Sequence, residues 1–351
     1  MTAQNQSRYR EIEAVGPPRE LGRQIGEQAR EETRGFCEVA LERVNKTVDI
    51  SRQRAIDIAR QSTEFAEKYR PDLVDELRGT AEAAGVTLDD LMLLQVRNQF
   101  APEKEGGCTS LSIQQPDNEC IVAQTWDNDP ALDEFTVVLT RRPEGKPATI
   151  ACTQAGLISY MGFSETGMGA CVNTLPAPSR GIGVPHYFTL RELFEATSLD
   201  EAVNSVRRAH RAIPVNVMLA TPQGPANLEI TIDDVRTLRP QNANWLAHSN
   251  HCVHPELVCV NEDFPDLIQS QARKQRIDKL MMSTDGTLEE LKRILSDHDG
   301  HPKSICRHPN DDQDNGFWTT VFAMIIEPSV RRMHISRGTP CQNEFDTYVL
   351  S

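Results

Sequence analysis

Residues 106–114 read Gly-Gly-Cys-Thr-Ser-Leu-Ser-Ile-Gln, and the character of the sequence changes at this point. A polar break, residues 101–105, precedes the two glycines, and a short β-like run begins directly after Cys108. Helix-forming sequence lies before the break and strand-forming sequence lies after it. We therefore predict two units: a helical segment over residues 1–107 and a mixed α/β body over residues 108–351.

The segment before Cys108 is predicted to be helical throughout. Residues 21–44 and 52–69 are rich in Glu, Arg, Gln and Ala and follow an amphipathic period. Pro71 occupies a favourable first position for the next helix, and Gly85 is well placed to end it. Thr87 opens a capping sequence, Thr-Leu-Asp-Asp, that predicts one more helix before the break.

The body after Cys108 alternates between strand and helix patterns. Residues 109–114 and 120–126 flank a turn at residues 116–118, which predicts a hairpin. Further strands are expected at residues 135–140, 149–153, 168–174, 215–220, 226–232, 245–247, 320–326 and 332–336. Helices are expected at residues 187–196, 199–212, 267–282 and 288–295. The pattern predicts an α+β fold.

Composition limits the classes of partner. The 351 residues carry a net charge of −14, which argues against nucleic acid or an anionic membrane as a partner. No apolar run approaches the roughly 20 residues that a membrane-spanning helix needs. The polar N-terminus lacks the apolar stretch of a signal peptide, so we predict a cytoplasmic protein. The oligomeric state stays open, with a homo-oligomer among the alternatives.

The cysteines point to reduced thiols. There are nine of them, an odd number, and none forms a Cys-x-x-Cys pair. This usage favours mostly buried, reduced side chains over a disulfide framework. Cys108 is singled out only by the two glycines before it.

The glycines suit a cysteine that cleaves its own chain. Glycine permits strained backbone and a close approach of the sulfur to the preceding carbonyl carbon. These are the requirements for an N-to-S acyl shift at Gly107–Cys108, after which the thioester hydrolyses. The α-amine freed on Cys108 has a reference pKa of about 7.7–8.0 and can take the thiol proton, so nucleophile and base belong to one residue.

Several motifs resemble one family of enzymes. Gly107-Cys108-Thr109-Ser110, followed nineteen residues after the cysteine by Asp127, looks like the processing site and first hairpin of the acyl-coenzyme A:6-aminopenicillanic acid acyltransferase family. The similarity continues in residues 155–163, 167–173, 248–252 and 304–307, and it includes the helix expected at residues 71–86. The family comprises cysteine N-terminal-nucleophile (Ntn) enzymes of the peptidase C45 type.

The resemblance implies roles for particular residues. Cys108 would be the nucleophile, and Gly107 with Cys108 would form the processing site. Asp127 would orient the α-amine and assist processing, and Asn250 would donate its side-chain amide to the oxyanion. Asn173 and Arg307 are further candidates to line the site. No metal ligand is assigned.

The resemblance also implies a fold and a reaction. The fold would be the four-layer αββα sandwich of Ntn hydrolases, with two antiparallel sheets between helical layers and the 1–107 segment still bound after self-cleavage. Cys108 would attack a small-molecule linear amide, and water or an amine would resolve the acyl-thioester. No cofactor is required.

One departure bears on the substrate. The family prototype carries an arginine just before the strand expected at residue 320, whereas residues 315–319 here read Asn-Gly-Phe-Trp-Thr. Arg307 is a candidate replacement. With the acidic charge and the lack of a phosphate-binding loop, this favours hydrolysis over acyl-CoA-dependent N-acyl transfer, which is the alternative.

Other classes of function compete with this interpretation. His248, His251, Cys252 and His254 could form a zinc-dependent hydrolase site, although their spacing matches no standard zinc motif. Asp297, His298, Asp299 and His301 could supply further ligands. A papain-like hydrolase could pair Cys108 with His248 or His251 in an uncleaved chain. A binding protein without catalysis is the third alternative.

Overall fold

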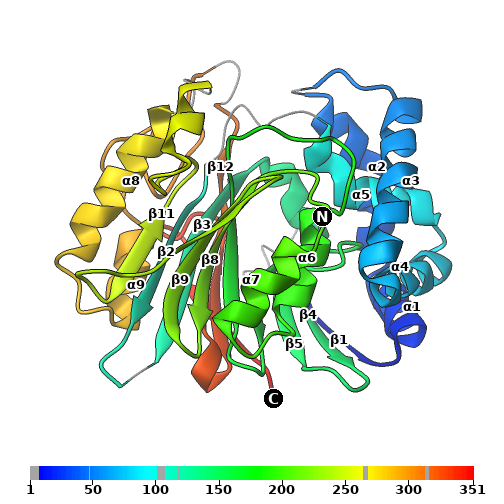
Figure 1. The fold of residues 1–351 in the computed structure, drawn as a ribbon, viewed down its shortest axis with the longest axis horizontal. Helices are drawn as coiled ribbons and strands as arrows, with labels where there is room; N and C mark the ends of the chain where they lie inside the picture. The colour runs from blue at the N-terminus through cyan, green and yellow to red at the C-terminus, as the bar shows by residue number, and fades with distance from the viewer. Residues whose placement is uncertain (1–7, 47, 101–106, 118, 264–267, 313–315) are drawn as a thin grey trace, which may run out of the picture.

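The computed structural model describes residues 8–46, 48–100, 107–117, 119–263, 268–312 and 316–351, and is drawn in Figure 1. The polar break predicted at residues 101–105 lies outside the described residues, as do Gly106, turn residue 118, the predicted helix start at residue 267 and Asn315.

Two β-sheets form the centre of the molecule. One contains six strands in the order β11 (Trp245–His248), β2 (Thr109–Gln114), β3 (Cys120–Asn128), β12 (Thr319–Glu327), β13 (Arg332–Arg337) and β14 (Phe345–Val349). The other contains eight strands in the order β1 (Glu11–Gly16), β4 (Thr136–Pro143), β5 (Thr149–Gln154), β6 (Met161–Ser164), β7 (Gly169–Thr174), β8 (Val215–Thr221), β9 (Gly224–Ile230) and β10 (Val235–Leu238). Strands β2 and β3 contact β7, β8 and β9, so the two sheets face each other.

Helices cover the two outer faces. Helices α8 (Ile268–Met281) and α9 (Leu288–Leu295) pack on the six-stranded sheet, coloured yellow in Figure 1. The other side carries α1 (Pro18–Gln28), α2 (Arg30–Val44), α3 (Arg52–Tyr69), α4 (Pro71–Ala84), α5 (Leu88–Val96), α6 (His186–Leu193) and α7 (Leu199–Arg207). Every residue of β8 and β9 is buried, as expected for central strands in such a stack. The architecture is the four-layer αββα sandwich that the family resemblance implied.

The helix boundaries follow local capping chemistry. Ser51 accepts a hydrogen bond from the Arg54 amide at the start of α3. Helix α4 ends at Gly85, whose φ of +73° lies in the left-handed region. Thr87 and Asp90 form the predicted capping box of α5. The single helix expected over residues 21–44 is two helices, because the chain leaves helical geometry at Ala29.

The segment before Cys108 is not purely helical, and this corrects the prediction. Strand β1 pairs in parallel with β4, six residues against six, as an edge strand of the eight-stranded sheet. Ile12 and Ala14 alternate into the core while their neighbours face outward, a pattern too short to identify from sequence. The eight-stranded sheet is therefore mixed, although its other pairs are antiparallel.

None of the helices in the described ranges has both the length and the apolar character needed to cross a membrane.

Candidate active site

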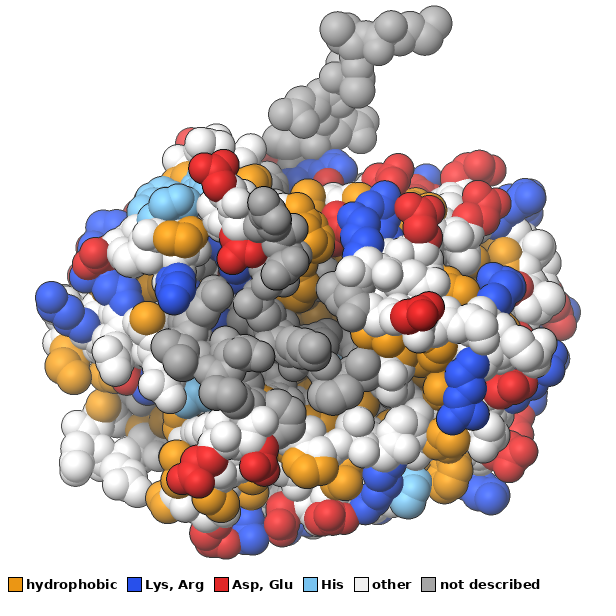
Figure 2. All heavy atoms as spheres, turned by 90° about the horizontal axis from the view of Figure 1, so that it is seen from above, with side chains coloured by type: hydrophobic (Ala, Val, Ile, Leu, Met, Phe, Trp, Pro, Cys, Tyr) orange, Lys and Arg blue, Asp and Glu red, His pale blue; other side chains and the backbone are white. Residues whose placement is uncertain are grey.

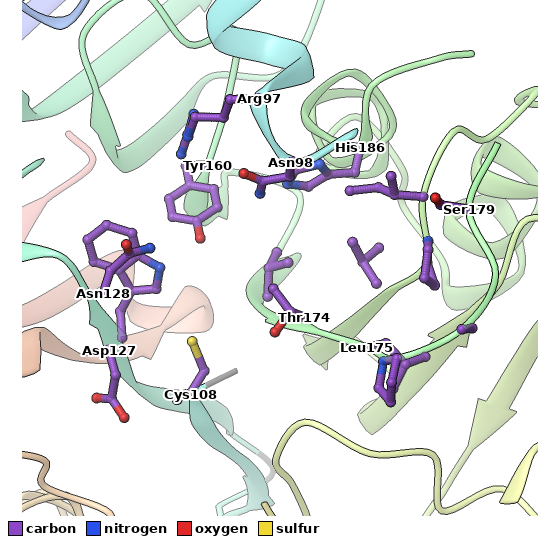
Figure 3. Close-up of a pocket in the computed structure, with 18 of the residues that line it drawn as sticks. Arg97, Asn98, Cys108, Asp127, Asn128, Tyr160, Thr174, Leu175, Ser179 and His186 are labelled. Carbon is purple, nitrogen blue, oxygen red and sulfur yellow. The ribbon is translucent and has the colours of Figure 1, made fainter. Parts of the chain in front are cut away.

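Cys108 lies at the wall of a cavity between the sheets and the N-terminal helices. It directly precedes β2, and its side chain is buried with 5% exposure. Figure 3 shows its sulfur pointing into the cavity, on the same side as the hydroxyl group of Tyr160. A nucleophile in this position is shielded from bulk water yet faces the space where a substrate would lie.

The cavity has an apolar part and a polar part. The apolar lining comes from Trp126, Tyr160, Val172, Leu175, Pro176, Ala177, Ile213, Pro214, Val215 and Trp318. The polar lining comes from Arg97, Asn98, Asp127, Asn128, Thr174, Ser179 and His186, and Gly107 and Cys108 complete the wall. Most of these residues lie on strands and loops that the sequence analysis did not connect with Cys108.

Gly107 is required for space. A Cβ atom built on Gly107 would lie 2.5 Å from Cβ of Asp127 and 2.9 Å from its Oδ2. The sequence suggested strained backbone as one reason for a glycine here. Gly107 is not among the glycines with positive φ, so the position does not require left-handed backbone. The missing side chain lets Asp127 pack directly against the Gly107–Cys108 segment.

Strand register brings Asp127 to this position. Thr109 of β2 pairs with Thr125 of β3, so residues 107 and 127 continue the same antiparallel ladder. Burial raises the pKa of Asp127 from its ordinary 3.8 to about 6, against the lowering effects of Arg273, of a hydrogen bond from Thr320, and of Arg307. Thr320 Oγ1 donates to Oδ1 over 2.7 Å, whereas Oδ2 has no hydrogen-bond partner among the described residues.

Arg307 lies close to Gly107 and to Thr320. The Arg307 Nη1 atom would be 3.2 Å from a Cβ on Gly107. The Arg307 backbone amide donates to Thr320 Oγ1, and the Thr320 backbone amide donates to the Arg307 carbonyl. Arg307 does not line the cavity. Its contacts with the site are the effect of its charge on Asp127, whose pKa it lowers, and its hydrogen bonds with Thr320.

Arg273 is a site residue that the sequence analysis missed. From α8, its Nη1 donates to the carbonyl oxygen of Cys108 over 2.5 Å and to Thr109 Oγ1 over 2.8 Å, while Nη2 donates to Asn250 Oδ1 over 2.8 Å. The basic run around it suggests a surface helix, but Arg273 is buried together with Ile277 and Leu280. That helical spacing places Arg273 on the inner face and was the signal available in the sequence.

Asn250 is joined to the cavity wall through Thr174. Its Nδ2 donates to the Thr174 carbonyl oxygen over 3.1 Å and to Thr174 Oγ1 over 3.0 Å. Asn250 is fully buried and does not line the cavity, whereas Thr174 does. Arg273 fixes the side-chain oxygen of Asn250, and Ser270 Oγ accepts a hydrogen bond from the Asn250 backbone amide. These two contacts hold the residue in place.

Asn173 lies behind the cavity wall instead of lining it. Its Oδ1 accepts from Ser110 Oγ over 2.8 Å and from Asn216 Nδ2 over 3.4 Å. These contacts link β7 to β2 of the opposite sheet and to neighbouring β8. Its place in the structure is a polar bridge between the layers.

The histidines considered as rivals are engaged elsewhere. His248 Nε2 lies 2.9 Å from Glu229 Oε1 in a fully buried pair, and its Nδ1 contacts the Ser249 carbonyl over 2.8 Å. His251 contacts Ser270, and neither histidine lines the cavity. Across the described ranges, His248, His251, Cys252 and His254 do not form a group of metal-ligating atoms. The zinc-hydrolase alternative is therefore not supported, and the geometry does not favour the papain-like pairing.

His186 is a second cavity residue that the sequence analysis missed. Burial, and then the charge of Arg97, lower its pKa to about 3, so the imidazole is neutral at pH 7. Its Nδ1 is buried and has no hydrogen-bond partner among the described residues. With Arg97, it gives the cavity a polar end opposite Cys108 (Figure 3).

Known proteins resemble the chain over most of its length. The family model for acyl-coenzyme A:6-aminopenicillanic acid acyl-transferase matches residues 113–342. The 40 kDa form of that acyltransferase from Emericella nidulans is 26% identical over 345 residues, covering 97% of this chain and 95% of the relative. A penicillin V acylase structure from Agrobacterium tumefaciens aligns with a TM-score of 0.46 and 11% identity, over 69% of this chain and 86% of that one. A mutant of conjugated bile acid hydrolase from Clostridium perfringens aligns with a TM-score of 0.44 and 11% identity, over 70% of this chain and 97% of that one.

Proposed function

Because the chain belongs to the acyl-coenzyme A:6-aminopenicillanic acid acyl-transferase family, we propose that it is a self-processing amidohydrolase whose N-terminal nucleophile is Cys108. The carrying observation is the combination of a cavity-facing Cys108 sulfur with a buried, partly unpartnered Asp127 packed on Gly107. Cleavage of the Gly107–Cys108 bond would divide the chain into residues 1–107 and 108–351.

Processing begins with attack of the Cys108 thiol on the carbonyl carbon of Gly107. The C–N bond breaks, the nitrogen leaves as the α-amine of Cys108, and the acyl group passes to sulfur. Water then hydrolyses the thioester to a Gly107 carboxylate and a free thiol. Asp127 supports this sequence because its ionised carboxylate can accept the thiol proton and return it to the departing nitrogen. Its Oδ2 lies against Gly107 with no competing partner among the described residues.

Turnover repeats the chemistry on a substrate. The α-amine of Cys108 takes the thiol proton, and the sulfur attacks the amide carbon. The resulting α-ammonium gives its proton to the leaving amine, which leaves an acyl-thioester on Cys108. Water resolves it to a carboxylic acid and regenerates the thiol; an acceptor amine would instead complete an acyl transfer.

Asn250 is our proposed side-chain donor to the oxyanion, with Arg273 as its positioning residue. Arg273 fixes the Oδ1 end of the Asn250 amide, so the NH₂ group is directed toward Thr174 at the cavity wall. Both hydrogens of this NH₂ group are bonded to Thr174 here, so a substrate oxygen would replace Thr174 Oγ1 as the acceptor of one of them. Once the substrate is bound, an amide held by Arg273 would already point at the developing charge.

The two chains should stay associated after cleavage. Strand β1 from the first chain pairs with β4 from the second. Glu76 of α4 and Arg141 of β4 form a buried ion pair with 2.8 Å between Oε1 and Nε, and Arg141 Nη2 also donates to the Leu157 carbonyl. Separating the chains would break these contacts and expose the apolar residues that the two segments bury against each other, which is unfavourable.

The cavity fits a small amide with an apolar acyl or amine group. Trp126, Tyr160 and Trp318 provide flat apolar walls, while Arg97 and neutral His186 suit a polar or anionic group at the other end. Arg97 is the one lysine or arginine among the described residues that line the cavity. On the face shown in Figure 2, the visible basic and acidic side chains are intermingled. These features favour hydrolysis over a multiply charged acyl-CoA donor.

A cytoplasmic location completes the proposal. None of the nine cysteines forms a disulfide in the structure, and Cys259 is an exposed thiol. Thiols of this kind persist in a reducing compartment.

Intact-mass spectrometry tests the proposal most directly. We expect chains of 107 residues and of 244 residues from wild-type protein, with Cys108 as the second N-terminus. Cys108→Ala should remain full length and should not release carboxylic acid from a panel of small acyl amides. Cys171→Ala, which changes a buried cysteine near enough to Cys108 for their charges to interact, is the matched control and should still cleave. A fully active wild-type enzyme that remains a single chain would refute self-processing.

A further inference from the structure

Four potential metal ligands from separate parts of the chain converge at one place outside the cavity. His298, Cys306 and His308 lie in the connection between α9 and β12, and Cys341 lies between β13 and β14. The ligand atom of each side chain is within 4.8 Å of the other three. None of the four lines the cavity, and none takes part in the chemistry proposed for Cys108.

Four of the six distances within this group match the edges of a tetrahedron around one ion. The two sulfurs are 3.7 Å apart, and His308 Nε2 lies 3.7 Å from Cys306 Sγ and 3.3 Å from Cys341 Sγ. The Nε2 atoms of His298 and His308 are 2.9 Å apart. Tetrahedral zinc, with Zn–S near 2.3 Å and Zn–N near 2.0–2.1 Å, gives edges of about 3.8 Å for S–S, about 3.5 Å for S–N and about 3.3 Å for N–N. Each of these four distances therefore agrees to within about 0.4 Å, and the His298 ligand atom lies within 4.8 Å of both sulfurs.

We propose that His298, Cys306, His308 and Cys341 bind one Zn²⁺ ion as a structural site. Two thiolates and two imidazoles in tetrahedral arrangement are a donor set typical of zinc. A two-iron cluster would place the cysteines on one iron and the histidines on the other, which the short S–N distances do not allow. Four protein ligands close the coordination sphere, so the ion would have no open position for catalysis.

The site would fix the segment that carries Arg307. Cys306 and His308 flank Arg307 in sequence, and the backbone of Arg307 bonds to Thr320, whose hydroxyl donates to Asp127. Cys306 is also held by its neighbours, because its amide donates to the Asp297 carbonyl and its carbonyl accepts from Ser304 Oγ. An ion bound on both sides of Arg307 and to Cys341 would tie this segment to the turn beyond β13. Any effect of the ion on processing rests on the function proposed above.

Metal content of the whole protein tests the site. Protein made without a histidine tag or nickel resin is equilibrated with ZnSO₄ under reducing conditions, dialysed against metal-free buffer and measured by elemental mass spectrometry. We expect about one zinc per chain in the wild type. Cys306→Ser and Cys341→Ser should bind zinc more than about 100-fold more weakly. Cys259→Ser, an exposed cysteine elsewhere, and His301→Ala, an exposed histidine in the same connection, should bind like the wild type.

Cobalt substitution gives a second readout. Co²⁺ in the wild type should show the thiolate-to-cobalt charge-transfer band and the intense visible bands of tetrahedral coordination. Cys341→Ser changes an exposed residue, so folding is retained while the charge-transfer band should weaken and zinc should be lost. A chelator should lower the thermal unfolding midpoint of the wild type and leave that of Cys341→Ser unchanged.

Three results would overturn the zinc site: wild-type protein that retains no zinc, variants that retain as much as the wild type, or a Cys306–Cys341 disulfide in protein from reducing cytoplasm. Cys108→Ala separates this inference from the proposed function. It should bind zinc normally although it cannot cleave, whereas failure of the zinc site would leave wild-type cleavage at Gly107–Cys108 intact.

Discussion

Replacement of Gly107 by alanine should block self-cleavage while leaving the fold intact. The new Cβ would lie 2.5 Å from Cβ of Asp127, whereas ordinary contacts begin near 3.4 Å, so the two residues must separate by about 0.9 Å. The obstructing atom is the Cβ of Asp127, at the base of its side chain, so rotation cannot relieve the clash. Strand β3 cannot move freely either, because it is paired on both sides, with β2 and with β12.

The expected magnitudes for cleavage and for stability differ. Overpacking of this kind typically costs about 1–3 kcal/mol of folding free energy. A displacement of about 1 Å at a reacting centre can lower a rate by about 10²-fold. We therefore expect Gly107→Ala to cleave at least about 100-fold more slowly than the wild type. Cleavage is followed by intact mass at intervals after cell-free synthesis, and stability is compared by urea unfolding of Cys108→Ala with and without Gly107→Ala.

Gly85→Ala provides the matched control. Gly85 has a φ of +73° with no atom within 4 Å of a built Cβ, so alanine there strains the backbone without a clash. The left-handed conformation costs roughly 1–2 kcal/mol, similar to the loss expected at Gly107, but far from Asp127. Gly85→Ala should cleave like the wild type. Wild-type cleavage by Gly107→Ala, or equal slowing by both variants, would refute the steric argument.

Other perturbations test the rest of the site. Asn250→Ala should lower kcat by about 10²–10³-fold with a smaller change in KM. Arg273→Lys should also lower kcat, because one ammonium group cannot replace the forked guanidinium that reaches both Cys108 and Asn250. Steady-state kinetics of the processed enzymes test both roles, and a wild-type kcat would contradict them. The cleavage rate of newly made wild-type chain should rise with pH through about 6 as Asp127 ionises. Thr320→Val should move this rise to higher pH, because it removes a hydrogen bond that favours the ionised carboxylate. Superimposable pH profiles of the two proteins would show that Asp127 ionisation does not control cleavage. The pKa of Asp127 in the folded chain exceeds its ordinary 3.8, so its ionisation destabilises the fold. The free energy of unfolding of Cys108→Ala should therefore fall between about pH 4 and 6 relative to that of Cys108→Ala with Asp127→Asn. Equal pH dependence of the two unfolding free energies would contradict a raised pKa. Processed enzyme offered both substrate types should prefer small acyl amides, and a tenfold or greater kcat/KM preference for acyl-CoA would reassign it as an acyltransferase.

Local sequence determined most secondary structure and the position of the proposed nucleophile, Cys108. Helix α3 has the predicted bounds, and the Thr87–Asp90 capping box and Gly85 end their segments as predicted, because these signals act within one turn of chain. The hairpin of β2 and β3 was equally visible, since its alternation and turn are contiguous. Cys108 could be singled out from the sequence because the two glycines and the family motif that mark it lie in one short stretch of chain.

Tertiary structure decided what surrounds that cysteine. Only the packing of α8 against β2 brings the Arg273 guanidinium to the carbonyl of Cys108, 165 residues away in sequence. Only the strand register places Asp127 against Gly107. Residue 107 is therefore a glycine because a side chain would collide with Asp127, and not because the backbone is strained. The sequence grouped His248 with His251 because they are neighbours in the chain and offered His298 only as a further ligand, yet the structure gathers His298 with Cys306, His308 and Cys341. Periodicity and capping are readable from neighbouring residues, whereas a site depends on distances between segments that only the assembled layers establish.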